Sequence, residues 1–342
     1  MRYRQLGQTG IRVSELGFGG IPILRLEKEE AGRILKHAQS IGINFFDTAN
    51  AYRDSEEKMG QSFAGIRDKV ILATKTMRRD GKGAQAQLEQ SLRLLRTDYI
   101  DIYQFHQVAQ ESAWQEIIAP DGALEVVQKA KNAGKIRVIG ITSHSRSMAI
   151  KLIQTGLFGT VQFPFNFIED AAKDDLHQEA RRLGVGILAM KPFAGGVIDN
   201  AAIAFKFLRQ YPDVLPLPGF DSIAAVDEVA AFYDTANAVR AEDLVHMDKY
   251  RQELGKQFCC RCEYCQPCPQ GVMITAAMAY KVIAHRMSAR VAVDFSRIPM
   301  ESVPKCIECG LCATRCPYEL PIPQMLKEHY AMWEQHGREI EK

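Results

Sequence analysis

Cysteine is absent from the first 258 residues of this 342-residue chain, although the whole chain contains nine. Disulfides and thiolate metal sites are thereby excluded from most of the sequence. Long hydrophobic runs are also lacking: nothing approaches the roughly 20 apolar residues that span a bilayer, and the N-terminus lacks the apolar core of a secretory signal. We therefore expect a soluble, cytoplasmic protein with no membrane partner. In a reducing compartment, clustered cysteines favour metal binding over disulfides.

An excess of charge of one sign is missing as well. Lysine and arginine total 43 against 41 for aspartate and glutamate, so the formal net charge is +2. With no basic run and no RNA-binding motif, we expect no nucleic-acid partner. Hydrophobic residues make up 46% and charged residues 25%, as in ordinary globular proteins. A chain of this length predicts one large domain and a smaller one.

Short apolar runs alternate with longer amphipathic segments in the first two thirds of the chain. The apolar runs are typical of buried strands, and several amphipathic segments end in glycine, a common helix stop. This alternation predicts an α/β fold, either a (β/α)8 TIM barrel or a doubly wound sheet, because both show it. The expected strands are residues 14–20, 44–49, 69–76, 99–106, 135–143, 160–165, 185–190 and 214–219.

The composition changes after about residue 240, where polar helical segments begin, and all nine cysteines lie between residues 259 and 316. We predict a domain boundary at this change, with the α/β domain at residues 1–240 and a small helical domain at residues 241–342.

The cysteines form two runs with a regular spacing. The second run has the pattern C-x2-C-x2-C-x3-C-P of bacterial ferredoxins, and the first is one residue shorter before its last cysteine. Together they resemble a dicluster ferredoxin domain with a helical insert. The first run is Cys259, Cys262, Cys265 and Cys268, and the second is Cys306, Cys309, Cys312 and Cys316.

Two-cluster ferredoxins give each [4Fe–4S] cluster three cysteines of one run and the last cysteine of the other. On that pattern Cys316 joins the first three cysteines of the first run, and Cys268 joins the first three of the second. Cys260 is left over, or it replaces Cys259. Two alternatives stay open. Structural zinc uses C-x2-C pairs but leaves the third cysteine of each run idle, and the shortened first run allows one cluster instead of two.

The first part of the chain resembles the aldo-keto reductase family, over roughly residues 1–235. The resemblance implies a (β/α)8 barrel that uses NAD(P)H to reduce a small-molecule carbonyl. With its cysteine region, the whole chain resembles the subgroup that has a C-terminal ferredoxin-like extension. The segments that carry the resemblance are LGQTGIRVSELGFGG (6–20), FDTANAYRDSEEKMG (46–60), VILATKT (70–76), DYIDIYQFH (98–106), KIRVIGITSHS (135–145) and VQFPFN (161–166).

The resemblance implies a catalytic group at the C-terminal mouth of the barrel, made of Asp47, Tyr52, Lys75 and His106. The chemistry is coherent, because a carbonyl that accepts hydride needs a proton. An ammonium group favours the phenolate of a nearby tyrosine, and a carboxylate keeps that ammonium charged. A histidine can hydrogen-bond the carbonyl oxygen. Taken singly, each residue also fits a plainer role as a cap, a surface aromatic, a solvated charge or a core histidine.

The resemblance also implies contacts to a nicotinamide cofactor. Ser143 and Gln162 match positions that hold the carboxamide, although the family commonly has Ser-Asn where this chain has Thr142-Ser143. Lys191 follows the seventh strand and points a cation into the mouth, or it is a solvated charge. Gly219, at the end of the eighth strand, and Ser222, which follows it, are the remaining expected cofactor contacts.

Two further positions depart from the family. Phe193, which offers the cofactor an apolar face or belongs to the core, stands in a segment that lacks the usual stacking aromatic. Asp221 stands where NADP-specific members have a basic residue. Because a carboxylate repels a 2′-phosphate, Asp221 favours NADH or another cofactor over NADPH.

Three hypotheses on function remain open. In the first, the protein is a carbonyl reductase whose clusters are structural or sense redox state. In the second, the clusters feed electrons to a substrate or flavin in the barrel, with an external electron-transfer partner, and the eight ferredoxin-spaced cysteines favour this. A flavin usually converts between the hydride of nicotinamide and single electrons, but no sequence feature identifies a flavin site. In the third, the barrel is a non-catalytic nicotinamide-binding sensor.

Overall fold

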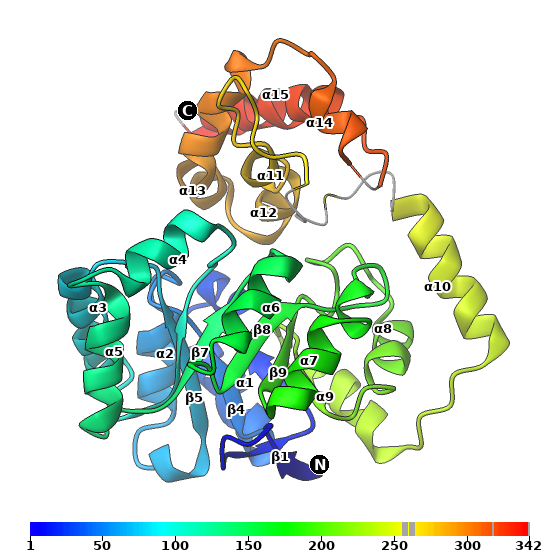
Figure 1. Ribbon diagram of the computed structural model, residues 1–342. Helices are drawn as coiled ribbons and strands as arrows, with labels where there is room; N and C mark the ends of the chain where they lie inside the picture. The colour runs from blue at the N-terminus through cyan, green and yellow to red at the C-terminus, as the bar shows by residue number, and fades with distance from the viewer. Residues whose placement is uncertain (255–258, 260–263, 317, 341–342) are drawn as a thin grey trace. The chain divides into compact units, whose positions relative to one another are not determined.

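The computed structural model describes residues 1–254, 259, 264–316 and 318–340 (Figure 1). The chain divides into two compact units. Residues 1–194 and 200–239 form the first unit, and residues 195–199 and 240–342 form the second.

The first unit contains eight parallel strands whose order in the sheet follows their order in the chain. The sheet closes on itself where Gly19 pairs with Gly219 and donates its amide hydrogen to the Pro218 carbonyl at 2.7 Å. This closure confirms the predicted (β/α)8 barrel and excludes the doubly wound sheet. The strands are β3 (Gly17–Gly19), β4 (Phe45–Asp47), β5 (Ile71–Thr76), β6 (Ile100–Phe105), β7 (Ile136–Thr142), β8 (Thr160–Pro164), β9 (Gly186–Met190) and β10 (Val214–Leu217).

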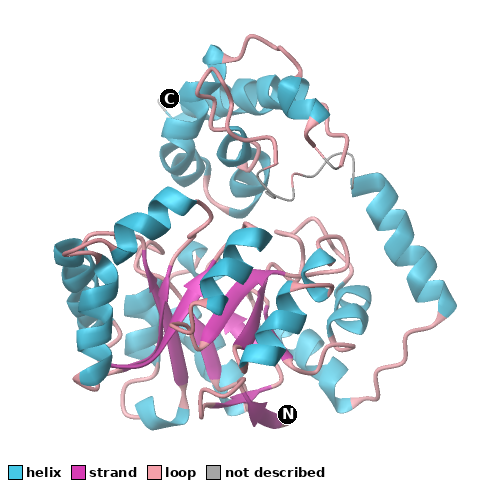
Figure 2. Cartoon of the chain, viewed as in Figure 1, coloured by secondary structure: helices cyan, strands magenta, loops and turns pink. Residues whose placement is uncertain are grey.

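Helices surround the strands (Figure 2). Helix α1 buries an apolar stripe in which Ala31, Ile34, Leu35 and Ala38 recur at helical spacing. Local signals set several helix ends: Asp80 accepts a hydrogen bond from Gly83 N at the start of α3, and Gly184 ends α7 in the left-handed region. The helices are α1 (Lys28–Ser40), α2 (Ser55–Ser62), α3 (Gly81–Leu94), α4 (Glu111–Ile118), α5 (Ala123–Asn132), α6 (Arg146–Gln154), α7 (Leu176–Leu183), α8 (Ala201–Leu208) and α9 (Ile223–Ala231).

An N-terminal hairpin, which the sequence did not predict, precedes the barrel strands. It pairs β1 (Tyr3–Gln5) with β2 (Arg12–Ser14) in antiparallel register. Leu6, Ile11 and Val13 are buried and belong to one apolar cluster with side chains from the barrel strands. Strands of three residues are too short to show a period of two, so only their packing against the barrel reveals them.

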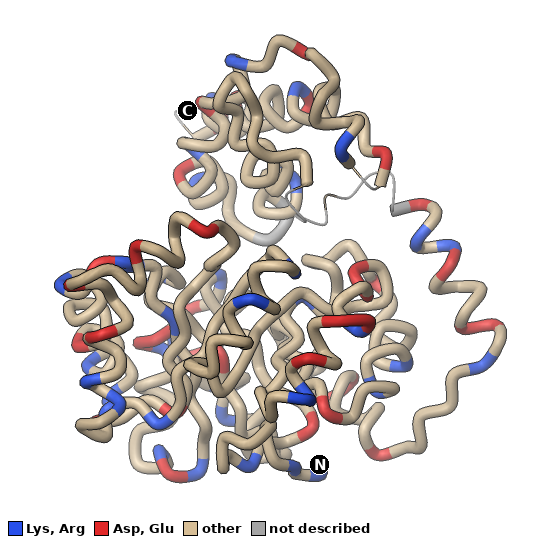
Figure 3. The backbone as a smooth tube through the Cα atoms, in the orientation of Figure 1, with Lys and Arg blue, Asp and Glu red and all other residues tan. Residues whose placement is uncertain are grey.

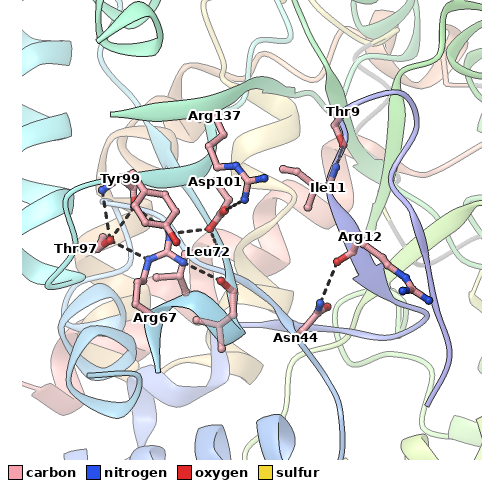
Figure 4. Close-up of polar contacts among 11 residues, drawn as sticks. Thr9, Ile11, Arg12, Asn44, Arg67, Leu72, Thr97, Tyr99, Asp101 and Arg137 are labelled. Carbon is pink, nitrogen blue, oxygen red and sulfur yellow. Dashed lines mark hydrogen bonds and ion pairs between the residues drawn. The ribbon is translucent and has the colours of Figure 1, made fainter. Parts of the chain in front are cut away.

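A buried carboxylate organises the N-terminal end of β6. Asp101 lies between Arg67 and Arg137, and each guanidinium group contacts one of its carboxylate oxygens at 2.7 Å (Figure 4). The backbone amide of Leu72 also donates to Asp101, at 2.9 Å. These contacts of Asp101 hold β5, β6 and β7 together at the end of the barrel away from the predicted catalytic group.

We therefore expect Asp101→Asn to destabilise the barrel by about 2 kcal/mol, because it leaves two guanidinium groups without their counter-charge. Chemical denaturation followed by circular dichroism measures the change. The matched control is Asp98→Asn, which removes an exposed carboxylate three residues away and should change stability by less than about 0.5 kcal/mol. Equal stability of the two variants would contradict the structural role of Asp101.

The second unit is helical. Its core contains Ile274, Ala277, Met278, Tyr280 and Leu326, and partly buried cysteines pack against this core. Helix α15 contributes the buried side chains of Ile322, Met325, Leu326 and His329. The helices are α10 (Ala241–Leu254), α11 (Ile274–Ala277), α12 (Tyr280–Arg286), α13 (Ala289–Ser302), α14 (Leu311–Thr314) and α15 (Ile322–Ile340).

Basic and acidic residues are interspersed along both units (Figure 3). Within the described ranges, no helix has the length and apolarity needed to cross a bilayer.

Candidate active site and cysteine pocket

The predicted catalytic residues lie at the C-terminal ends of neighbouring strands. Asp47 is the last residue of β4, Lys75 lies next to the end of β5, and His106 directly follows β6. Tyr52 lies in the loop between β4 and α2. Because the strands are parallel, these ends share one rim of the barrel, the rim at which TIM barrels hold their active sites.

Lys75 and Asp47 form a buried ion pair. The Lys75 ammonium donates to Asp47 Oδ2 at 2.6 Å and to the Thr48 carbonyl at 2.7 Å. The side chains of Lys75 and Asp47 are only 2% and 6% exposed, so solvent screens the pair weakly. Burial lowers the pKa of Lys75, and the Asp47 carboxylate acts in the opposite direction.

Tyr52 and His106 complete the group. The Lys75 Nζ atom lies 5.2 Å from the centre of the Tyr52 ring, and the Tyr52 and His106 rings meet edge to face with centroids 5.7 Å apart. Arg53, which follows Tyr52, has a φ of +37°, an uncommon conformation for a non-glycine residue. The structure thus brings all four predicted residues together.

His106 is held in its neutral form. Burial keeps its pKa well below the usual range, and the positive charges of Lys75 and Arg79 act in the same direction. Its backbone carbonyl accepts a hydrogen bond from Arg79 Nη2 at 2.5 Å. Among the residues that the structure describes, His106 Nδ1 has no hydrogen-bond partner. A neutral imidazole carries one N–H, which can donate to a substrate oxygen.

Sequence reasoning missed Gln104, which is fully buried on β6. Its amide donates to Asp47 Oδ1 at 3.1 Å, and the amide of Gln162 donates to Asp47 Oδ2 at 3.3 Å. Two glutamines and Lys75 therefore hold the same carboxylate. The available signal was the strand period, because Gln104 stands two residues before His106 and so points to the same side of the chain.

The predicted nicotinamide contacts have local roles in the structure. The Ser143 hydroxyl donates to the Ser145 carbonyl and accepts from the Ser145 amide, both at 3.0 Å. Ser222 caps α9 by accepting from Ala225 N at 3.2 Å. Gly219 closes the barrel, and a Cβ there would lie 2.5 Å from Pro22 Cγ.

Three other predicted positions lie near the ends of the last two strands. Lys191 directly follows β9 with a φ of +58°, and its carbonyl accepts from Asn166 Nδ2 at 3.0 Å. The Phe193 ring packs on Phe205 with centroids 5.8 Å apart. Asp221 follows β10, and its carboxylate lies 3.9 Å from the guanidinium group of Arg25, which ends the short helix Pro22–Arg25 after β3.

In the second unit, cysteines of both runs line one pocket. Cys268 of the first run lies there with Cys306, Cys309 and Cys312 of the second, and Cys265 lines it as well. Within the described part of the chain, no three His, Cys, Asp or Glu side chains converge tightly enough for a single metal ion. Thiols arranged around a shared space fit the multi-iron cluster predicted from their spacing. Cys259 and Cys316 are partly buried on the same unit's core, and Cys260 and Cys262 lie outside the described residues.

Two family models match the chain. Residues 15–203, more than half of the chain, match the Aldo/keto reductase family. The chain belongs to the aldo/keto reductase family. Residues 258–321 match the 4Fe-4S dicluster domain, so this oxidoreductase carries an iron–sulfur domain. The match to that domain favours iron–sulfur over zinc for its cysteines.

Relatives support the same assignment. Aldo-keto reductase YhdN of Bacillus subtilis (strain 168) is 33% identical over 256 residues, which are 67% of this chain and 75% of the relative. Uncharacterized oxidoreductase YrpG of the same organism is 32% identical over 234 residues, 59% of this chain and 70% of the relative. The solved holo form of aldo-keto reductase AKR11C1 from Bacillus halodurans shares the fold, with a TM-score of 0.64 and 24% identity over 73% of this chain and 96% of that chain.

Proposed function

We propose that this protein is an NAD(P)H-dependent carbonyl reductase in which Tyr52 donates the proton. Its reductase domain is residues 1–240, its iron–sulfur domain is residues 241–342, and its substrate is a small-molecule aldehyde or ketone in the cytoplasm. The observation that carries the proposal is the buried pair of Lys75 and Asp47, with Lys75 Nζ 5.2 Å from the centre of the Tyr52 ring. The Tyr52 ring in turn meets the His106 ring edge to face.

The roles of the residues follow from their charges. When bound, the nicotinamide cofactor supplies the hydride. Lys75 stabilises the negative charge that develops on the Tyr52 oxygen as the phenol gives its proton to the alkoxide. Asp47, held by Lys75 and two glutamine amides, keeps the ammonium in place. The neutral His106 donates its N–H to the carbonyl oxygen and orients it.

The cofactor side of the mouth favours NADH. Asp221 supplies negative charge after β10, and the guanidinium group of Arg25, at 3.9 Å, neutralises it in part. Gln162 Oε1 has no hydrogen-bond partner among the described residues and suits the amino group of a carboxamide. Ser143 would have to exchange a local hydrogen bond for a cofactor contact. Lys191, Gly219 and Ser222 would line the remainder of the site.

The cysteines would hold two [4Fe–4S] clusters, which supply one-electron transfer when bound. Cys268, Cys306, Cys309 and Cys312 share a pocket that Cys265 also lines, and the crossed spacing of two-cluster ferredoxins assigns those four to one cluster. Cys259, Cys262, Cys265 and Cys316 would hold the other.

A second candidate function is electron transfer from the clusters to a substrate or flavin in the barrel. The exposed position of Cys309 favours it, because that thiol brings one edge of the pocket to the surface, where an electron-transfer partner can approach. A purely sensing barrel is disfavoured by the complete catalytic group.

One experiment separates the two functions. Anaerobically purified protein is mixed with NADH or NADPH, with and without 4-nitrobenzaldehyde, while nicotinamide and cluster absorbance are recorded. We expect aldehyde-dependent oxidation with a lower KM for NADH than for NADPH, and a cluster band that persists. Bleaching of that band by NADH alone would favour electron transfer, and an absence of aldehyde-dependent oxidation would reject carbonyl reduction.

A further inference from the structure

Glu56, in the first turn of α2, is a buried carboxylate that the proposed chemistry does not use. Its side chain is fully buried, whereas the adjacent Glu57 pairs with Lys28 at 2.6 Å in a partly exposed position. A carboxylate is costly to bury, so its site must supply hydrogen bonds. Glu56 Oε1 accepts from the Thr74 hydroxyl at 2.6 Å, and Oε2 lies 3.3 Å from Asn50 Nδ2.

The two partners of Glu56 flank the catalytic group. Thr74 directly precedes Lys75 on β5, so their side chains point to opposite faces of the strand. Asn50 stands two residues before Tyr52, and its backbone amide donates to the Lys75 carbonyl at 3.1 Å. One carboxylate therefore ties the strand that carries Lys75 to the loop that carries Tyr52.

Hydroxyl groups also tie the start of this loop to its end. Thr48 donates to Ser55 Oγ at 2.8 Å, and Ser55 donates to the Gly20 carbonyl at 3.0 Å. Arg53, with its φ of +37°, lies within the loop that both sets of contacts close. An unfavourable backbone conformation persists only where surrounding contacts determine it. The buried hydrogen bonds of Glu56 supply part of that constraint.

Charge links Glu56 to Lys75 as well. Burial raises the pKa of Glu56, while its hydrogen bonds and the Lys75 charge act in the opposite direction. Lys75 contacts Asp47 from β4 and the Tyr52 ring from the loop, and its charge acts on His106 after β6. Gln104 from β6 and Gln162 from β8 contact Asp47. The groups near Glu56 are the side chains of Thr74, Ser91 of α3 and Asn50 and, by charge, Lys75 and the Tyr103 hydroxyl of β6.

We infer that Glu56 is a positioning residue for the Tyr52–Lys75 pair: it fixes the Tyr52 loop against β5 and adds a second negative charge that stabilises the Lys75 ammonium from behind the strand. The inference rests on the proposed carbonyl reduction, in which Tyr52 and Lys75 act together. On this inference the negative charge of Glu56 affects the reaction, in addition to the hydrogen bonds that its side chain accepts.

The test compares Glu56→Gln, Glu56→Ala and the matched control Glu57→Gln. Glutamine keeps an acceptor for Thr74 but removes the charge, so kcat for 4-nitrobenzaldehyde should fall about 10-fold with little change in the KM for NADH. The midpoint of the basic limb of the kcat profile should move to lower pH by about 0.5 unit or more, because loss of a negative charge favours loss of a proton from the pair. Alanine should lower kcat about 100-fold, and Glu57→Gln should change neither quantity.

A purely structural role would lower kcat equally at every pH and leave the midpoint in place, which would overturn the inference. A second readout needs no turnover: alkaline titration of the Tyr52 phenol by ultraviolet absorbance, as the difference between each protein and its Tyr52→Phe counterpart. The Glu56→Gln midpoint should lie below that of the unsubstituted protein. An inactive unsubstituted protein would reject the proposed function alone, and equal phenol midpoints would reject the role of Glu56 alone.

Discussion

Replacement of Tyr52 by phenylalanine should lower aldehyde-dependent NADH oxidation by about 10³-fold and leave the iron content unchanged. The ring can keep its edge contact with His106 and its position 5.2 Å from Lys75 Nζ, while the proton donor is lost. The loss should fall on kcat, because hydroxyl removal leaves the buried pair of Lys75 and Asp47 intact. Steady-state kinetics and an iron assay on the same preparation measure both quantities.

The matched control is Tyr211→Phe. Tyr211 packs on Phe165 and Phe207 near the start of β10, at the opposite end of that strand from the catalytic mouth. Its hydroxyl has no part in the proposed reaction, so turnover should be unchanged. Full activity in Tyr52→Phe would show that another group supplies the proton, and the roles given to Lys75 and His106 would then have to be reassigned.

Substitution of Cys268 by serine should remove about half of the bound iron, from about eight to about four atoms in each chain. Cys268 belongs to the first run in sequence, but it lines a pocket with Cys306, Cys309 and Cys312 as well as with Cys265 of its own run. By the crossed spacing, Cys268 is a ligand of the same cluster as the first three cysteines of the second run, so its substitution should remove that cluster. Iron and acid-labile sulfide assays on anaerobic protein measure the loss.

A double variant tests whether the two cysteines serve one cluster. If Cys268 and Cys309 hold the same cluster, Cys268→Ser with Cys309→Ser retains as much iron as either single variant. Loss of nearly all iron from the double variant would assign them to different clusters. Cys260→Ser is the control: as the predicted surplus cysteine it should keep full iron, and a loss there would place Cys260 among the ligands.

Much of the barrel could be predicted because its signals are local. Each of the eight barrel strands, β3 to β10, falls within one predicted strand, since buried parallel strands appear as short apolar runs. The cysteine runs are local as well, because three ligands of an iron–sulfur cluster come from a few consecutive turns of the chain. The hairpin of β1 and β2 was missed, since its packing partners are distant in sequence.

Some residues of the candidate site could likewise be predicted from the sequence, and others could not. Asp47, Tyr52, Lys75 and His106 were predicted from the resemblance to the aldo-keto reductase family, and the structure brings them together. Gln104 carried no such signal. Its amide matters only because Asp47, 57 residues away, lies 3.1 Å from it.

The sequence by itself determined the alternation of strands and helices, the iron–sulfur character of the cysteines and the identity of the catalytic candidates. The first two depend on residues a few positions apart, where periodicity and ligand spacing act, whereas the catalytic candidates came from the resemblance to the aldo-keto reductase family. Only the tertiary structure decided that the sheet closes through Gly19 and Gly219, and that Arg25 lies beside Asp221. It alone placed Glu56 behind Lys75. Such contacts join segments that chain folding brings together, and no local pattern records the free energy of that packing.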